Sequence, residues 1–201
     1  MLTRLLVKIK HNCPWLWTGV EDVNSWLTHL RYPRAKAVAI KEIEQHNLKN
    51  PALRWSLVTP AGAERLSEFL TSLPEERTRY FAAHSFTPNA LRRMASGRSF
   101  IMLKVEDCAS GQIVGYHFLR CFFIGRSFHG LIVSDQASGR GIGTAMWALG
   151  AEIAAAVGMT MRATISEHNL PSLRSCQRGT DCTILERMPD GYLLVDCKPR
   201  R

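Results

Sequence analysis

The sequence predicts an α/β fold of the α+β kind, in which a mixed, mostly antiparallel sheet is flanked by helices and follows an N-terminal extension. Three observations predict it. The chain has 201 residues, which is enough for one domain and an extension. From about residue 53 onward, short apolar runs alternate with segments of helical spacing. Most neighbouring strands are joined by short turns, and one strand–helix–strand unit supplies a crossover.

Residues 1–52 are expected to form the extension, and residues 53–201 the main domain. The extension contains loop signals at Cys13-Pro14, Tyr32-Pro33 and Asn50-Pro51 and one polar helix over residues 35–48. The apolar residues Leu2, Leu5, Leu6 and Ile9 can share one face of a short amphipathic helix. We expect that helix to pack on its own domain, with a membrane-surface role as the alternative.

The elements of the main domain follow from apolar periodicity and turn residues. Pro60, the 109–112 turn, Gly158 and the Asp190-Gly191 hairpin turn separate them. The expected strands cover residues 53–59, 100–105, 113–123, 128–133, 160–165, 183–187 and 192–197. The expected helices cover residues 61–73, two pieces that start at Pro74 and Pro88, residues 144–157, and a short helix capped by Asn169 that runs through Cys176.

Composition excludes several classes of protein. Hydrophobic residues make up 46% of the chain, and no apolar run approaches the roughly 20 residues that span a bilayer. The basic N-terminus lacks a signal-peptide core. The six cysteines show no C-x-x-C spacing, so we expect reduced thiols in a cytoplasmic protein and no metal site.

The net charge of +9 favours an anionic ligand or partner. The basic clusters are short, and none lies in a recognised nucleic-acid motif, so nucleic acid is not expected as the partner. The sequence does not decide between a monomer and a homodimer.

The segment VSDQASGRGIGTAM, residues 133–146, follows an apolar strand and opens an Ala-rich helix. Gly139, Gly141 and Gly143 let backbone N–H groups approach a ligand closely, and a helix N-terminus favours negative charge. Arg140 is expected to add positive charge within the turn. A pyrophosphate fits this chemistry, and a turn that holds no ligand is the alternative.

Two known phosphate loops do not match. The nucleotide P-loop requires Gly-Lys-Ser/Thr after a four-residue gap, and that pattern is absent. The dinucleotide fingerprint G-x-G-x-x-G would place its last glycine one residue later than Gly143.

Residues 131–146 instead resemble motif A of the GNAT superfamily of acyl-CoA N-acyltransferases. The family pattern is Gln/Arg-x-x-Gly-x-Gly/Ala at the start of a helix, and here Gly141 and Gly143 match, whereas Ser138 replaces the Gln/Arg. The resemblance implies a GNAT-like fold and acetyl-CoA as co-substrate. It also implies that cofactor contacts come from Leu131, Ile132, Val133, Ser138, Gly139, Arg140, Gly141, Ile142, Gly143, Thr144 and Asn169.

The resemblance continues past the next strand. The family has an Asn, a short helix that often carries a Tyr, and then Gly-Phe. Asn169 and Gly179 match approximately, Cys176 stands at the Tyr position, and Thr180 replaces the Phe.

The resemblance also implies a mechanism. A bulge in the strand before the turn would expose N–H groups that polarise the thioester carbonyl. Cys176 is the positional candidate for the general acid, with a small core residue as the alternative. His129 is the candidate general base. His117 lies on the neighbouring expected strand, and Glu167 and His168 follow the expected strand at residues 160–165. Water can relay the proton if the amine arrives deprotonated.

The implied activity is direct acetyl transfer to a primary amine. Residues 80–88, 114–120 and 190–194 are similar to GNAT members from bacterial surface-polysaccharide pathways, which suggests an amino sugar or a nucleotide-linked amino sugar. A protein amine and a polyamine remain alternatives. A further alternative is an acyl-CoA-binding regulatory module without efficient catalysis.

Overall fold

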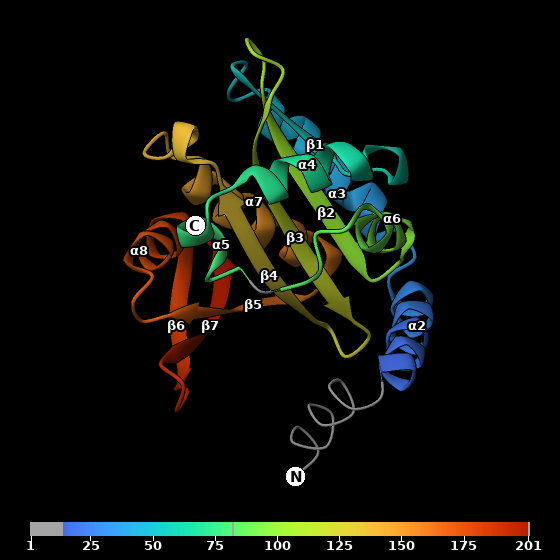
Figure 1. Cartoon of the computed structure of the whole chain (residues 1–201). Helices are drawn as coiled ribbons and strands as arrows, with labels where there is room; N and C mark the ends of the chain where they lie inside the picture. The colour runs from blue at the N-terminus through green and yellow to red at the C-terminus, as the bar shows by residue number, and fades with distance from the viewer. Residues whose placement is uncertain (1–13, 82, 201) are drawn as a thin grey trace.

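The computed structural model describes residues 14–81 and 83–200. A seven-stranded sheet with strand order β1-β2-β3-β4-β5-β7-β6 runs through the molecule, with helices on both faces (Figure 1). All neighbouring strands are antiparallel except β4 and β5, which are parallel. The strands are β1 (Leu53–Leu57), β2 (Phe100–Asp107), β3 (Ile113–Phe122), β4 (Arg126–Val133), β5 (Thr160–Ser166), β6 (Thr180–Arg187) and β7 (Tyr192–Pro199).

The helices follow the expected order, with one addition near the N-terminus. They are α2 (Pro14–Arg31), α3 (Ala35–Asn47), α4 (Ala63–Ser72), α5 (Glu75–Thr78), α6 (Pro88–Ser96), α7 (Ile142–Val157) and α8 (Leu170–Gly179), with 3-10 turns η1 (Pro60–Gly62) and η2 (Asp135–Ala137). None of the helices among the described residues is long and apolar enough to cross a membrane.

The mixed, mostly antiparallel sheet flanked by helices confirms the expected fold class. The seven expected strands are all present, and the expected bounds differ by a few residues at the ends. The largest shift is in β6, which begins at Thr180 directly after α8 rather than at Thr183. The amphipathic helix expected around Leu2–Ile9 lies outside the described residues.

Helix α2 corrects the expectation of loop structure after Cys13-Pro14. Proline is tolerated in the first turn of a helix, where its missing N–H has no intrahelical partner anyway, so Pro14 begins this helix rather than preventing it. The helix is anchored on β3, because the Asn24 side chain donates to the Cys121 carbonyl over 3.0 Å.

The two faces of the sheet bury separate hydrophobic clusters. Side chains alternate between faces along a strand, so in β2 Ile101 and Leu103 face one cluster and Met102 faces the other. The first cluster is covered by α3 and α7, and the second by α4 and α6. Helix α3 is fixed to β1 by Asn47, whose side chain accepts from Trp55 N over 2.8 Å and donates to Trp55 O over 2.9 Å.

Strands β4 and β5 separate after a short parallel contact. Their pairing begins at Arg126/Thr160 and ends at Phe128/Arg162, although both strands continue for several residues. Beyond this point, within the described part of the chain, β5 pairs only with β7. The C-terminal half of β4 therefore keeps β3 on one side and loses its sheet partner on the other. The resulting opening lies beside the start of α7.

The resemblance implied a bulge in β4, and the structure corrects this expectation. The β3/β4 register is continuous from Gly115/Val133 to Phe122/Arg126. Backbone N–H groups of β4 become accessible for a different reason, namely the separation from β5. Ser134 donates its N–H to Val114 O of β3 over 2.9 Å. Because N–H directions alternate along a strand, those of Leu131 and Val133 point toward the opening.

Candidate functional site

The glycine turn before α7 has the backbone shape that only glycine adopts without strain. Gly139 and Gly141 have φ values of 78° and 79°, and Gly141 is the N-cap of α7. The first intrahelical bond runs from Ala145 N to Gly141 O over 3.0 Å. The N–H groups of residues 142–144 precede that bond and point out of the helix end, where they form a site for negative charge.

A cavity of about 640 Å³ lies at this helix end. It is bordered by all the expected cofactor-binding residues except one: Leu131, Ile132, Val133, Ser138, Gly139, Gly141, Ile142, Gly143, Thr144 and Asn169. The structure thus brings the end of β4, the turn and the start of α7 together around one space. Asn169 also caps α8, because its side chain accepts from Ser172 N over 3.3 Å.

Arg140 is the exception among the expected cofactor residues. Its guanidinium pairs with Asp107 Oδ2 over 3.1 Å, and it is not among the residues that border the cavity. The guanidinium of Arg140 therefore lies outside the cavity lining, and its role in cofactor binding stays a prediction. Asp107 is held in place, because it also accepts from the backbone N–H groups of Ala109 and Ser110.

The positive charge at the cavity comes from residues that the sequence analysis did not assign to the site. Arg77 and Arg79 reach it from the α5 region, and Arg174 and Arg178 from α8. Arg77 also donates to Ser138 Oγ over 3.3 Å and forms an ion pair with Asp135, so it holds α5 against the turn. The basic cluster at residues 77–79 was visible in the sequence, but nothing there indicated that α5 would lie against the turn that follows β4.

A second cavity, of about 490 Å³, meets the first at the opening between β4 and β5. Both cavities are bordered by the same five residues: Arg77, Tyr80, Leu131, Asn169 and Ser172. The second cavity is further lined by aromatic side chains, including Phe81, Phe118 and Tyr192. The Leu131 N–H therefore lies at the junction between a space suited to an anion and a space suited to a second reactant.

His129 borders the second cavity, but its ring is buried and its Nε2 faces a second histidine. It is 6% exposed, lies 4.6 Å from Trp147 between ring centroids, and its Nε2 is 3.1 Å from Nδ1 of His117. Burial lowers the pKa of His129 to about 3. A base this weak removes few protons from an ammonium group near pH 7, so this environment does not favour the expected role as general base.

The buried His117–His129 pair predicts acid-sensitive stability. Burial also lowers the pKa of His117 well below its usual value. The unfolded chain therefore binds more protons than the folded chain below about pH 6.5, and stability falls as the pH drops from there toward 3. For His129 the loss at pH 5 is about 2 kcal/mol relative to neutral pH. Urea unfolding at pH 7.5 and at pH 5 measures this loss as a difference in the free energy of unfolding.

A His129→Asn variant gives the matched comparison for the pH effect. Its free energy of unfolding is expected to change less between the two pH values than that of the wild type, even if its stability at pH 7.5 is lower. An equal pH dependence in both proteins would contradict the assignment to the histidine pair.

Cys176 lies on α8 and packs into the hydrophobic cluster that α7 covers. It is fully buried, it borders neither cavity, and its Sγ is 3.5 Å from Sγ of Cys197. The pKa of Cys176 is raised to about 12, chiefly by its interaction with the Cys182 thiol. This placement favours the alternative of a core residue over the expected proton donor. Of the other candidates, Glu167 pairs with Arg187, and His168 borders the first cavity.

Comparison with known proteins shows which family has this fold. The family model for the acetyltransferase (GNAT) family matches residues 63–179, which is more than half of the chain. No curated protein matches.

Several solved structures share the fold. The GNAT domain of S. lividans PAT is 18% identical, with a TM-score of 0.62 over 72% of this chain and 89% of that one. The protein yncA from Salmonella typhimurium, solved with its cofactor acetyl-CoA, is 20% identical, with a TM-score of 0.57 over 73% and 92%. The aminoglycoside acetyltransferase AAC(6')-Ib, solved with coenzyme A and kanamycin, is 15% identical, with a TM-score of 0.56 over 74% and 95%.

Proposed function

The chain belongs to the GNAT acetyltransferase family, and we propose that it transfers an acetyl group from acetyl-CoA to a primary amine that carries an anionic group. The observation that carries this proposal is the pair of joined cavities at the β4/β5 opening, with the start of α7 at one end and an aromatic space at the other.

The first cavity is proposed to hold acetyl-CoA. The N–H groups of residues 142–144 would bind the pyrophosphate, together with the arginines that border this cavity. The pantetheine arm would then run along β4 toward Leu131. The relatives solved with coenzyme A or acetyl-CoA support this choice of cofactor.

The chemical step is proposed to occur where the cavities meet. The amine attacks the thioester carbonyl carbon, and the carbonyl oxygen gains negative charge as the bond to sulfur weakens. The Leu131 N–H, which has no sheet partner in β5, would stabilise that charge. The tetrahedral intermediate then expels the CoA thiolate and leaves the amide. Because neither His129 nor Cys176 lies in a suitable environment, we propose that the acceptor reacts as the free amine and that water carries the proton away.

The charges around the second cavity support an anionic acceptor. Arg77 and Arg120 border it, and none of its lining residues within the described part of the chain is acidic. The carboxylates that pair with these arginines, Asp135 and Glu21, lie outside that lining. A polycation such as kanamycin would find no counter-charge there, whereas a phosphate could bind a guanidinium. An amino sugar phosphate or a nucleotide-linked amino sugar fits these requirements.

Release of free CoA thiol in the presence of acetyl-CoA and a panel of amines tests the proposal. The panel contains glucosamine, glucosamine 6-phosphate, a uridine-diphosphate-linked amino sugar, kanamycin and a peptide with a free N-terminus. The kcat/KM for a phosphorylated amino sugar is expected to exceed that for the unphosphorylated sugar by about 10-fold or more, the effect of one charge-assisted hydrogen bond.

Preferred turnover of kanamycin would contradict the anionic acceptor. Preferred turnover of the peptide would instead favour a protein amine as acceptor. Saturable binding of acetyl-CoA without turnover of any amine would favour the regulatory module, and such binding is measured separately by the thermal shift that acetyl-CoA causes.

A further inference from the structure

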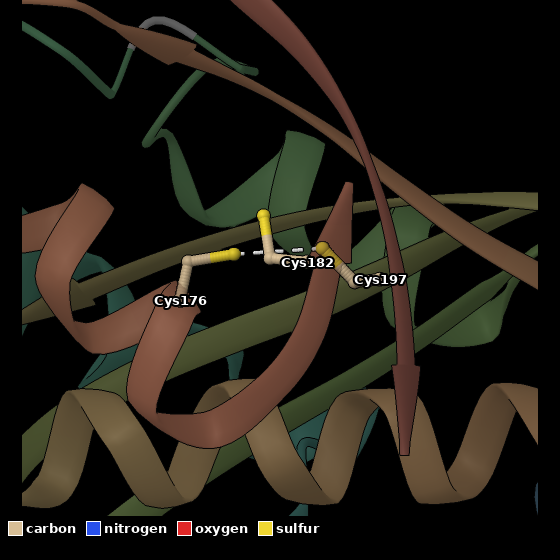
Figure 2. Close-up of side chains that lie close together, drawn as sticks. All are labelled: Cys176, Cys182 and Cys197. Atoms are coloured by element: carbon tan, nitrogen blue, oxygen red, sulfur yellow. Dashed lines mark hydrogen bonds between the residues drawn. The ribbon is translucent and has the colours of Figure 1, made fainter. Parts of the chain in front are cut away.

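Three cysteine side chains from three different elements meet beside α8, outside the lining of either cavity. Cys176 comes from α8, Cys182 from β6 and Cys197 from β7, and Figure 2 shows their side chains gathered between the helix and the two strands. Their three sulfur atoms lie within 4.8 Å of one another, and the Cys176 and Cys197 sulfurs are 3.5 Å apart.

The fold explains why no sequence pattern indicated this cluster. Cys182 and Cys197 are register partners in the β6/β7 hairpin, so their side chains lie on the same face of the sheet. Helix α8 leads directly into β6 at Thr180, which brings Cys176 above that face. The cluster therefore depends on strand pairing, and its spacing does not resemble C-x-x-C.

The surroundings of the cluster are apolar. Cys176 and Cys197 are buried within the hydrophobic cluster under α7, and Cys182 is partly exposed at the edge strand β6. Within the described residues, one side-chain oxygen lies within hydrogen-bond distance of these sulfurs, namely Thr180 Oγ1 at 3.7 Å from Cys176 Sγ. That hydroxyl donates to the Cys176 carbonyl over 2.9 Å.

The close approach of the three thiols shifts their pKa values in opposite directions. Hydrogen bonding from the Cys176 thiol, and next from the Cys197 thiol, lowers the pKa of Cys182 to about 3. The same interactions raise the pKa of Cys176 to about 12 and that of Cys197 still further. A cation at the centre of the three sulfurs would stabilise the deprotonated form of all three cysteines.

We propose that Cys176, Cys182 and Cys197 form a three-thiolate site for a single thiophilic metal ion, either Zn²⁺ or Cu⁺. Thiolate ligands select these ions over harder cations. With a metal–sulfur distance of about 2.3 Å, three sulfurs around one ion lie about 3.8 Å apart. The Cys176–Cys197 pair, at 3.5 Å, must open slightly, and any pair near the 4.8 Å limit must close by about 1 Å. Binding converts the thiols to thiolates and releases their protons to solvent.

The site would strengthen the wall of the cofactor cavity. Ser172 and Ser175 border that cavity from α8, the same helix that carries Cys176 on its buried side. An ion at the cluster would join α8 to β6 and β7. The expected consequence is a higher melting temperature for the metal-loaded protein.

Metal titration of the full-length protein tests this site. The protein is reduced and treated with a chelator, and Zn²⁺ and Cu⁺ are then added in separate experiments, each against a competing chelator that reports free metal. One equivalent per chain is expected to bind, more weakly as the pH falls. Cys182→Ser is expected to weaken binding by about 100-fold or more, because even residues that only orient a ligand contribute 10- to 100-fold. Cys182 is chosen because it is the least buried of the three.

Cys108→Ser is the matched control, because Cys108 is an exposed free cysteine outside the cluster. It should bind metal as the wild type does. If Cys182→Ser fails to fold, a Co²⁺ titration of the wild type still decides the question, since thiolate-to-cobalt absorption reports sulfur ligation directly.

Three results would overturn the proposal. They are the absence of stoichiometric binding of either ion to the reduced wild type, equal affinity in Cys182→Ser, and the finding by mass spectrometry that the protein as purified carries a Cys176–Cys197 disulfide. Preference for Zn²⁺ or for Cu⁺ identifies the ion.

Discussion

Gly141→Glu is expected to abolish acetyl-CoA binding. The substitution places a carboxylate at the N-cap of α7, beside the N–H groups that are proposed to bind the pyrophosphate. The added carboxylate would repel the negatively charged pyrophosphate. Its side chain would also occupy the space in which the pyrophosphate is proposed to bind. In a thermal melt, acetyl-CoA at about a hundredfold over its Kd stabilises the wild type by about 2.7 kcal/mol, and the variant is expected to show no shift.

Gly158→Glu is the matched control for this substitution. Gly158 caps the other end of the same helix with a φ of 86°, and an added Cβ at either glycine meets no atom within 4 Å. Both variants therefore incur similar backbone strain, of about 1–2 kcal/mol, so a difference in acetyl-CoA response reports the position of the charge. A ligand-induced shift in Gly141→Glu equal to that of Gly158→Glu would contradict the placement of the pyrophosphate.

Leu131→Pro is expected to lower kcat by about 10²- to 10³-fold, the usual effect of losing one backbone or side-chain donor to the oxyanion. Proline removes the N–H that points into the opening between β4 and β5. No sheet hydrogen bond is lost, because that N–H has no partner strand, and proline is tolerated at such edges. The residue before it is Gly130, whose lack of a Cβ reduces the clash with the proline ring. Steady-state kinetics with the best acceptor measure the effect.

Leu131→Ala separates the side chain from the backbone. It removes a similar amount of apolar contact and keeps the N–H, so its kcat should stay within about 10-fold of the wild type. Acetyl-CoA must still raise the melting temperature of the proline variant, which shows that the cavity is intact. Equal kcat values in the two variants would exclude the Leu131 N–H as the stabilising donor.

Local patterns predicted most of the secondary structure. Alternation predicted β2 and β3, and the Asp190-Gly191 turn predicted the hairpin of β6 and β7, because each of these signals depends on neighbouring residues only. Helix α2 was missed because Pro14 was taken as a loop signal, although proline also begins helices.

The parts of the site that were missed all depend on long-range contacts. Arg140 was expected to face the ligand, but its partner Asp107 lies at the end of β2, 33 positions away. The separation of β4 from β5, which exposes the Leu131 N–H, depends on β5 pairing with β7. The thiol cluster depends on the register between Cys182 and Cys197. The spacing of residues within one segment gives no information about their contacts with distant segments of the chain.

The central claim is that acetyl-CoA lies between the β4/β5 opening and the start of α7. Amide hydrogen exchange with and without acetyl-CoA tests it most directly. New protection is expected at Leu131, Val133 and residues 142–144, whose N–H groups face the proposed ligand. Ile132 should change little, because its N–H points toward β3 and already belongs to the sheet. Protection confined to other segments, or none at saturating acetyl-CoA, would contradict the account.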